Sequence, residues 1–200
     1  MSITTYAELQ TAIAAWLARD DLTATIPDFI ALFEADANLK LRTRLQTATA
    51  SFTTTNGEHA LPADFSSAVR VTFMGSARAG LQYLDPEVLL YDYPTGPTGM
   101  PAAYTVEGTT LRVRPIDDGT PLELVYRALV PPLAAGVNWL LQKYPNLYLF
   151  GSLCEAQGFA VDADKFALWQ ARRDQLYRDI QLDDFRSIDG ATIRPLGATP

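Results

Sequence analysis

Apolar residues recur at helical spacing near the N-terminus of this 200-residue chain. One stripe predicts a helix from Tyr6 to about Arg19. Thr5 as the N-cap and Glu8 as the third helical residue fit a capping box. A second helix is predicted from Ile26 to about Leu45, because its apolar stripe keeps the 3.6-residue period. Basic residues gather at the end of this second helix, where they suit the helix dipole or offer a contact to an acidic partner.

The stretch from Asn138 to about Ile180 organises the C-terminal half. Pro145 suits the first turn of a helix that is apolar on nearly every side, so this helix must be buried on several faces. Gly151 and Gly158 share one of its faces and would let a neighbouring helix approach closely. A second helix follows with an apolar stripe and an Asp174–Arg178 pair on its polar face. The stripe consists of Phe166, Trp169, Leu176 and Ile180.

Between the helical parts the pattern changes to the alternation of strands. The predicted strands span residues 47–55, 68–74, 81–84, 103–107, 110–114 and 122–130. Asn56-Gly57 predicts a tight turn, and Gly108 predicts a second hairpin. Asp85 caps a short helix over 87–91, and the Pro- and Gly-rich stretch 94–101 predicts a loop.

These elements predict an α+β fold with a discontinuous, four-helix-type helical domain. That domain comprises residues 1–46 and 133–185, and a β-sandwich or barrel-like domain is inserted at 47–132. Residues 186–200 are too short for a domain and carry Gly and Pro breaks, but they keep several large apolar side chains. We expect an extended C-terminal arm there.

Charge and cysteine content narrow the functional classes. The net charge of −7 argues against a general nucleic-acid-binding surface, because phosphate contacts need Lys and Arg. An acidic protein surface could nevertheless lie next to DNA, because it repels the phosphates and would let the DNA pass without binding it. Cys154 is the only cysteine, which excludes an intrachain disulfide and fits a reducing compartment. The sequence contains no run of 18 apolar residues, so we expect no transmembrane helix. The N-terminus has neither a basic region nor an apolar region of the kind found in signal peptides, so we expect no signal peptide.

Residues that carry chemistry are sparse. His59 is the only histidine, and neither a nucleophile elbow, a phosphate-binding loop nor a metal-ligand spacing is present. Asp117 and Asp118 precede Gly119, so we interpret them as part of a turn. We interpret Asp183 and Asp184 as residues at a helix end. Cys154 is read as an inert core thiol. We therefore expect no enzyme, no cofactor and no bound metal.

Several motifs in order resemble a known family. They are Leu61-Pro-Ala-Asp-Phe65, Leu81-Gln-Tyr-Leu-Asp-Pro-Glu-Val-Leu89, Tyr104-Thr-Val-Glu-Gly-Thr-Thr-Leu-Arg-Val-Arg-Pro115, Leu122-Glu-Leu-Val-Tyr-Arg127, the run from Asn138 to Ala156, and Trp169-Gln-Ala-Arg-Arg173. Each motif has low specificity by itself, but the set in this order resembles the head-to-tail adaptor (connector) proteins of tailed bacteriophages, including the tail tubular protein A-like group. The resemblance spans nearly the whole chain and is weakest after Arg186.

The resemblance implies a structural protein of the virion neck, assembled in the cytoplasm of the host bacterium. Twelve copies would form a ring between the portal protein and a downstream tail or stopper protein, lining a channel through which double-stranded DNA passes without sequence-specific binding. In similar proteins the C-terminal segment reaches the portal. The residues expected to contact the portal are Arg186, Ile188, Ile193, Arg194 and Leu196.

One alternative from the residues alone is a non-enzymatic ligand-binding or interaction module, with the β-sandwich inserted in a helical stalk. Three tyrosines, Tyr91, Tyr93 and Tyr104, would serve it if they were exposed. A soluble monomer that holds a small ligand would favour the module, whereas rings formed with a portal would favour the connector.

Overall fold

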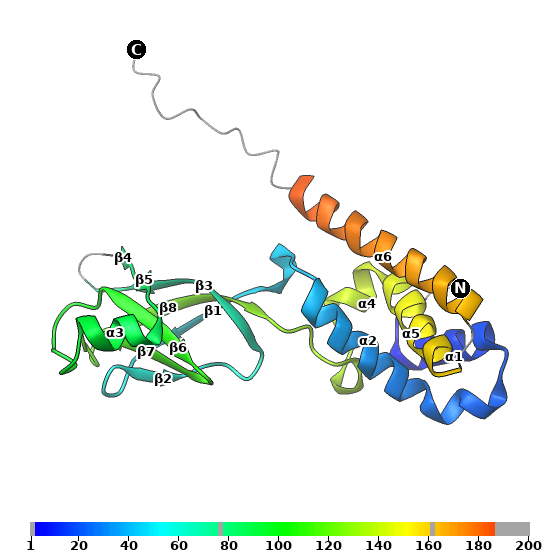
Figure 1. The fold of residues 1–200 in the computed structure, drawn as a ribbon, viewed down its shortest axis with the longest axis horizontal. Coiled ribbons are helices and arrows are strands. Elements are labelled where there is room, and N and C mark those ends of the chain that lie inside the picture. The colour runs from blue at the N-terminus through cyan, green and yellow to red at the C-terminus, as the bar shows by residue number, and fades with distance from the viewer. Residues whose placement is uncertain (1–2, 76–77, 161–162, 187–200) are drawn as a thin grey trace, which may run out of the picture. The chain divides into compact units, whose positions relative to one another are not determined.

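The computed structural model describes residues 3–75, 78–160 and 163–186. Both helices and sheets are present, which confirms the α+β class. The chain divides into two compact units, described separately below (Figure 1). The helical unit comprises Met1–Leu45 and Val130–Pro200, and the β unit comprises Gln46–Leu129.

The helical unit begins with the predicted capping box. Helix α1 spans Tyr6–Leu17; the Thr5 side chain accepts a hydrogen bond from the Glu8 N–H, and the Glu8 carboxylate accepts from the Thr5 N–H. A 3₁₀ turn, η1 (Asp20–Thr25), leads into α2 (Ile26–Lys40). The sequence pattern therefore located both helix starts.

Helix α2 ends earlier than predicted. Its last residue is Lys40, and the backbone of Leu41 is extended at φ −74° and ψ 133°. Leu41 is completely buried, so it contributes to the core although its backbone is no longer helical. A short 3₁₀ turn, η2 (Arg44–Gln46), follows. The predicted end near Leu45 was wrong because the stripe alone does not distinguish these backbones.

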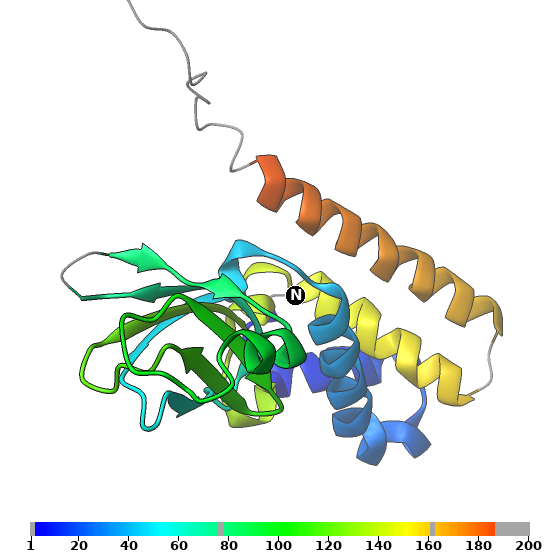
Figure 2. The same cartoon turned by 60° about the vertical axis from the view of Figure 1, so that its left-hand side comes forward.

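The C-terminal half is built around α5. A turn η3 (Leu133–Ala135) and a short helix α4 (Trp139–Lys143) precede α5 (Pro145–Ala160), which starts at the predicted proline. Helices α1, α2, α4 and α6 all pack against α5 (Figure 2). Leu147, Tyr148, Leu153 and Cys154 are fully buried along it. The expectation that this helix is enclosed on several faces is confirmed.

The two glycines of α5 face different helices. A side chain at Gly151 would overlap the Phe33 ring of α2, so this glycine permits the close approach of the two helices. A Cβ at Gly158 would lie 3.4 Å from the Phe166 ring of α6, which is ordinary contact. Only the first glycine is therefore required by packing.

Helix α6 (Ala163–Arg186) runs antiparallel to α5. Ile180 is buried and Trp169 and Leu176 are partly buried, as predicted, but Arg173 and Tyr177 are buried with them. The predicted Asp174–Arg178 pair is replaced: Asp174 accepts from Arg173, and Arg178 donates to Gln175.

The β unit is a sandwich of two four-stranded sheets. The first has the order β1 (Thr47–Phe52), β8 (Leu122–Ala128), β3 (Phe65–Phe73) and β4 (Ala79–Gly80). The second has the order β2 (Glu58–Ala60), β7 (Thr110–Arg114), β6 (Ala103–Glu107) and β5 (Gln82–Tyr83). Side chains from both sheets share one apolar core, which includes Val71, Leu111, Val113, Leu122 and Leu124.

The turns of the sandwich follow their sequence signals. Asn56 and Gly57 have φ of 55° and 71°, the left-handed geometry of a tight hairpin turn, between paired Thr55 and Glu58. Helix α3 (Pro86–Asp92) begins at the predicted cap Asp85. The predicted strand 81–84 is shorter, since only Gln82–Tyr83 forms β5, parallel to β6.

Candidate functional site

The residues expected to contact the portal lie at the end of the described chain. Arg186 is the last residue of α6. Ile188, Ile193, Arg194 and Leu196 lie outside the described residues. The structure therefore defines only the helix that precedes residues 187–200.

The last turns of α6 are tied to two other segments of the helical unit. The Tyr144 hydroxyl donates to Asp183 at 3.4 Å, and the Arg44 N–H donates to Asp184 at 3.0 Å. Arg44 also forms an ion pair with Asp184 at 3.3 Å. Leu182 and Phe185 remain 51% and 65% exposed. The C-terminal end of α6 thus combines fixed polar contacts with exposed apolar side chains.

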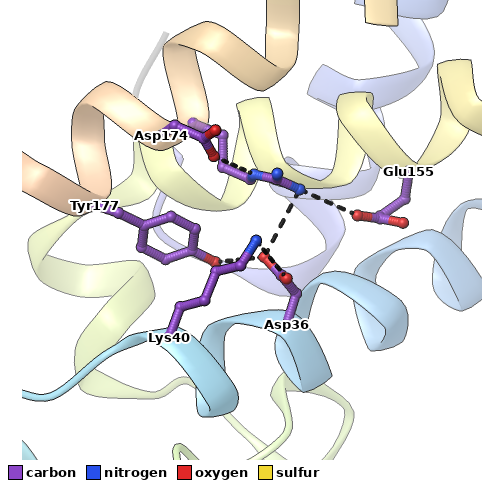
Figure 3. A network of polar contacts seen from close by, with 6 residues as sticks. Asp36, Lys40, Glu155, Asp174 and Tyr177 are labelled. Carbon is purple, nitrogen blue, oxygen red and sulfur yellow. Dashed lines mark hydrogen bonds and ion pairs between the residues drawn. The ribbon is translucent and has the colours of Figure 1, made fainter.

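A polar network joins α2, α5 and α6 (Figure 3). The Arg173 side chain is only 7% exposed, and its guanidinium lies 3.4 Å from Glu155 of α5, 3.7 Å from Asp36 of α2 and 3.1 Å from Asp174. The Tyr177 hydroxyl donates to Asp36 at 3.0 Å, and Lys40 pairs with the same carboxylate at 2.7 Å. Sequence periodicity missed this network because an arginine on a helix is normally counted as solvated.

The network also accounts for the basic end of α2. Burial and the nearby Asp36 carboxylate raise the pKa of Tyr177 well above its usual range, so the phenol stays protonated and keeps donating. Lys40 is paired with Asp36, and Arg42 donates to the carbonyl oxygens of Asn38 and Leu41. These cations act within their own chain, which supports the dipole interpretation.

A second polar cluster holds the chain where it returns from the β unit. Asn38 accepts from the Val130 N–H at 2.7 Å, and the buried Glu34 carboxylate accepts from the Leu133 N–H at 2.8 Å and the Tyr148 hydroxyl at 3.2 Å. Asn138 donates to the Tyr148 hydroxyl at 2.7 Å. Burial raises the pKa of Glu34.

The residues first considered for chemistry have structural partners. The His59 ring stacks on Phe52 at a centroid distance of 4.2 Å. Asp118 accepts from the Gly57 N–H at 2.8 Å, which lowers the pKa of its carboxyl, and Asp117 accepts from the Gly119 N–H. Cys154 is buried, and burial raises the pKa of its thiol.

Large apolar side chains lie exposed on several helices of the helical unit, including α2 and α6. Leu32 and Leu39 of α2 are 55% and 75% exposed, and Leu168 and Leu182 of α6 are each 51% exposed. Leu32 and Leu39 are seven residues apart and therefore share one face of α2. Exposed apolar residues in such groups are typical of protein-binding surfaces.

The β unit carries a groove of about 630 Å³ beside α3. Tyr93 lines it, and Tyr91 nearby is 85% exposed. Tyr104 is buried against Tyr83, with ring centroids 5.6 Å apart, so it cannot serve as an exposed recognition aromatic.

Among the described helices, none has the length and apolar character needed to cross a membrane. Within residues 3–75, 78–160 and 163–186, no cluster of three or more His, Cys, Asp or Glu side chains is arranged to hold a metal ion.

Comparison with known proteins assigns the chain to a family. The family model described as SU10 adaptor protein matches residues 4–195, which includes both units. A search of curated proteins gives no match. The resemblance to phage head-to-tail adaptors is confirmed at the level of the family. The chain belongs to the SU10 adaptor protein family and is a structural component of a phage virion.

Proposed function

We propose that this adaptor is one subunit of a ring of twelve copies between the portal and the tail, and that the ring lines the DNA exit channel. The observation that carries the proposal is the family match over residues 4–195, which includes the helical unit and the inserted β unit. The ring would assemble in the cytoplasm of the host bacterium and become part of the virion neck.

The exposed apolar side chains of the helical unit support a ring. A closed ring joins one surface of each copy to a different surface of the next, so each copy needs two complementary patches. Leu32 and Leu39 on α2 supply one candidate patch, and Leu182 and Phe185, three residues apart on α6, supply another. Burying them between copies would remove apolar surface from water, which favours association.

The charge of the chain supports the channel role. A net charge of −7 repels the phosphate backbone, so DNA would move past the ring without being held. The function is then mechanical: surfaces join the portal to the tail, and no covalent chemistry is required.

The C-terminal arm is proposed to dock on the portal. Its candidate contacts are Ile188, Ile193, Arg194 and Leu196, with Arg186 at the end of α6. Strand addition to a sheet edge of the partner is one docking mode that would suit such a segment.

The ring is tested by measuring the mass of the full-length chain alone and with purified portal protein. We expect a twelve-membered ring in the presence of portal. The double variant Leu32→Asp, Leu39→Asp should keep its circular dichroism spectrum and lose the ring. Val69→Asp is a matched control, because Val69 is 54% exposed on β3 of the β unit. Wild-type chain that stays monomeric with portal would contradict the proposal.

A further inference from the structure

We propose that the groove beside α3 docks a cationic, apolar segment of the protein that follows the adaptor toward the tail. This inference rests on the proposed function and specifies the partner of the β unit. The groove lies between α3, the turn at residues 93–96 and the β2-β7-β6 part of the second sheet, with a volume of about 630 Å³. It lies entirely within the β unit.

The apolar content of α3 is the first argument. This seven-residue helix buries Leu89 at 5% exposure, but Val88, Leu90 and Tyr91 are 44%, 67% and 85% exposed. Leu89, Leu90 and Tyr93 line the groove, and the exposed Val88 and Tyr91 lie on the same helix. The apolar lining of the groove therefore continues onto the exposed surface of α3. A short helix that exposes more apolar side chains than it buries is typical of a surface completed by a partner.

Charge on the same helix determines the chemistry of the partner. Asp85, Glu87 and Asp92 are exposed on α3 and its cap, and this segment has no basic residue. A segment that presents Lys or Arg beside large apolar side chains would complement both features. Opposite charges across an interface favour the encounter and exclude acidic competitors.

The arginines of the groove do not reverse this charge. Arg112 forms ion pairs with Glu58 at 3.0 Å and Glu107 at 2.9 Å. Arg114 donates to the Val113 carbonyl oxygen at 2.8 Å, toward its own turn. The lining carries three carboxylates, Glu58, Glu87 and Glu107, against these two guanidiniums, so the groove keeps a net negative charge. Glu87 lines the opening without a basic neighbour on its helix.

A second copy of the chain is the competing occupant. Its C-terminal arm contains Ile193-Arg194-Pro195-Leu196, which also combines an arginine with large apolar residues. We assign the groove to the downstream protein because the arm is proposed to bind the portal. A synthetic peptide of residues 187–200 distinguishes the two.

The test measures binding of labelled probes to the full-length chain by fluorescence anisotropy. The cationic probe is a short peptide in which arginine alternates with leucine and tryptophan. One comparison probe carries glutamate in place of arginine, and another carries serine in place of leucine and tryptophan. We expect the cationic apolar probe to bind at least about tenfold more tightly than either, with affinity falling as salt is added. Equal binding of the acidic probe, or tighter binding of the arm peptide, would overturn the assignment.

Variants locate the binding. Leu90→Ser with Tyr91→Ser should weaken the cationic probe about tenfold, and Glu87→Lys should weaken it while improving the acidic probe. These side chains are exposed, so folding should be unchanged. Val69→Ser is the matched control, because it removes an exposed apolar side chain elsewhere on the β unit. Variants that bind like wild type would exclude the groove.

Purified phage particles separate this inference from the proposed function. Particles made with the Leu90→Ser, Tyr91→Ser adaptor should retain the adaptor on the portal and lack the downstream proteins. Complete tails on these particles would overturn the inference alone. Wild-type adaptor that is absent from portal-bearing heads would instead contradict the proposed function, whatever the probes show.

Discussion

A single buried carboxylate links the stability of the helical unit to pH. Burial raises the pKa of Glu34 above its usual value of 4.5. A carboxyl with a higher pKa in the folded chain contributes stability that is fully present below the unfolded pKa and is lost as pH rises through the folded pKa. The ionised form of Glu34 therefore lowers the free energy of unfolding, because the hydrogen bonds from Leu133 and Tyr148 offset only part of its desolvation.

Glu34→Gln tests that sign. Glutamine keeps an oxygen that can accept from Leu133 and Tyr148 but does not titrate. Relative to this variant, the wild-type free energy of unfolding should increase as pH falls through the raised pKa toward 4.5 and level off below that value. Urea unfolding of both proteins across that range measures the difference. A difference that is constant with pH would show that Glu34 is not perturbed in the folded chain.

Gly151 and Gly158 provide a matched pair of substitutions on one helix. Gly151→Ala would push a methyl group into the Phe33 ring, and overpacking of this kind costs about 1–3 kcal/mol. Gly158→Ala meets only the Phe166 ring at 3.4 Å and should stabilise the helix by about 0.5–1 kcal/mol. Urea unfolding of the two variants should therefore give opposite signs. Equal effects would mean that helix propensity, not packing, decides both.

At the scale of elements, α6 is attached by a buried arginine in addition to its apolar contacts. Arg173→Ala would remove a cation from between Asp36 and Glu155 and should destabilise the chain by about 1.5–3 kcal/mol. The partner carboxylates are partly exposed, which keeps the cost below that of a fully buried pair.

Arg172→Ala is the control for this variant. Arg172 is exposed on the same helix, so its loss should change stability by no more than about 0.5 kcal/mol. Thermal melting of both variants makes the comparison. If the two variants melt alike, the network in Figure 3 contributes nothing to the attachment of α6.

The elements that sequence predicted best are those with local signals. The capping box at Thr5, the proline at residue 145 and the Asn56-Gly57 turn each fix backbone geometry through neighbouring residues. The end of α2 was mispredicted because Leu41 is buried on extended backbone, which the apolar period does not reveal. The pairing of β5 with β6 depends on a partner distant in sequence.

The candidate site was less predictable than the fold. The buried position of Arg173 follows from carboxylates on two other helices, and no local pattern indicates it. The groove beside α3 likewise needs β2, β6 and β7 to come together. The arm residues were found through resemblance, and four of the five lie outside the described chain.

At the scale of the whole molecule, the arm is expected to contribute to attachment and not to folding. Ordering a chain segment costs about 1–2 kcal/mol per residue, so short segments order mainly when they bind. Deleting residues 187–200 should leave the melting temperature of the isolated chain unchanged and weaken its binding to portal protein. Lower stability with normal portal binding would place these residues in the chain's own fold.

Charge gives a second expectation for the whole molecule. With 16 Lys and Arg against 23 Asp and Glu, the chain should not bind double-stranded DNA, even at low salt where phosphate contacts are strongest. Anisotropy of a labelled duplex, measured with the chain alone and with assembled rings, tests this. Salt-sensitive binding by the rings would reveal a basic surface created by assembly.

The two chain segments that connect the units both lie near the C-terminal end of α2. Asn38, in its last turn, hydrogen-bonds Val130, where the chain returns from the β unit, and Leu41 follows the helix directly on the outgoing path. The helical unit can therefore accept an insertion of different size or fold without changing its own core, provided that the insertion begins and ends close together. Exchange of the inserted β unit would therefore change the surface that it carries while the core of the helical unit stays the same, and it offers the engineer a position for grafting.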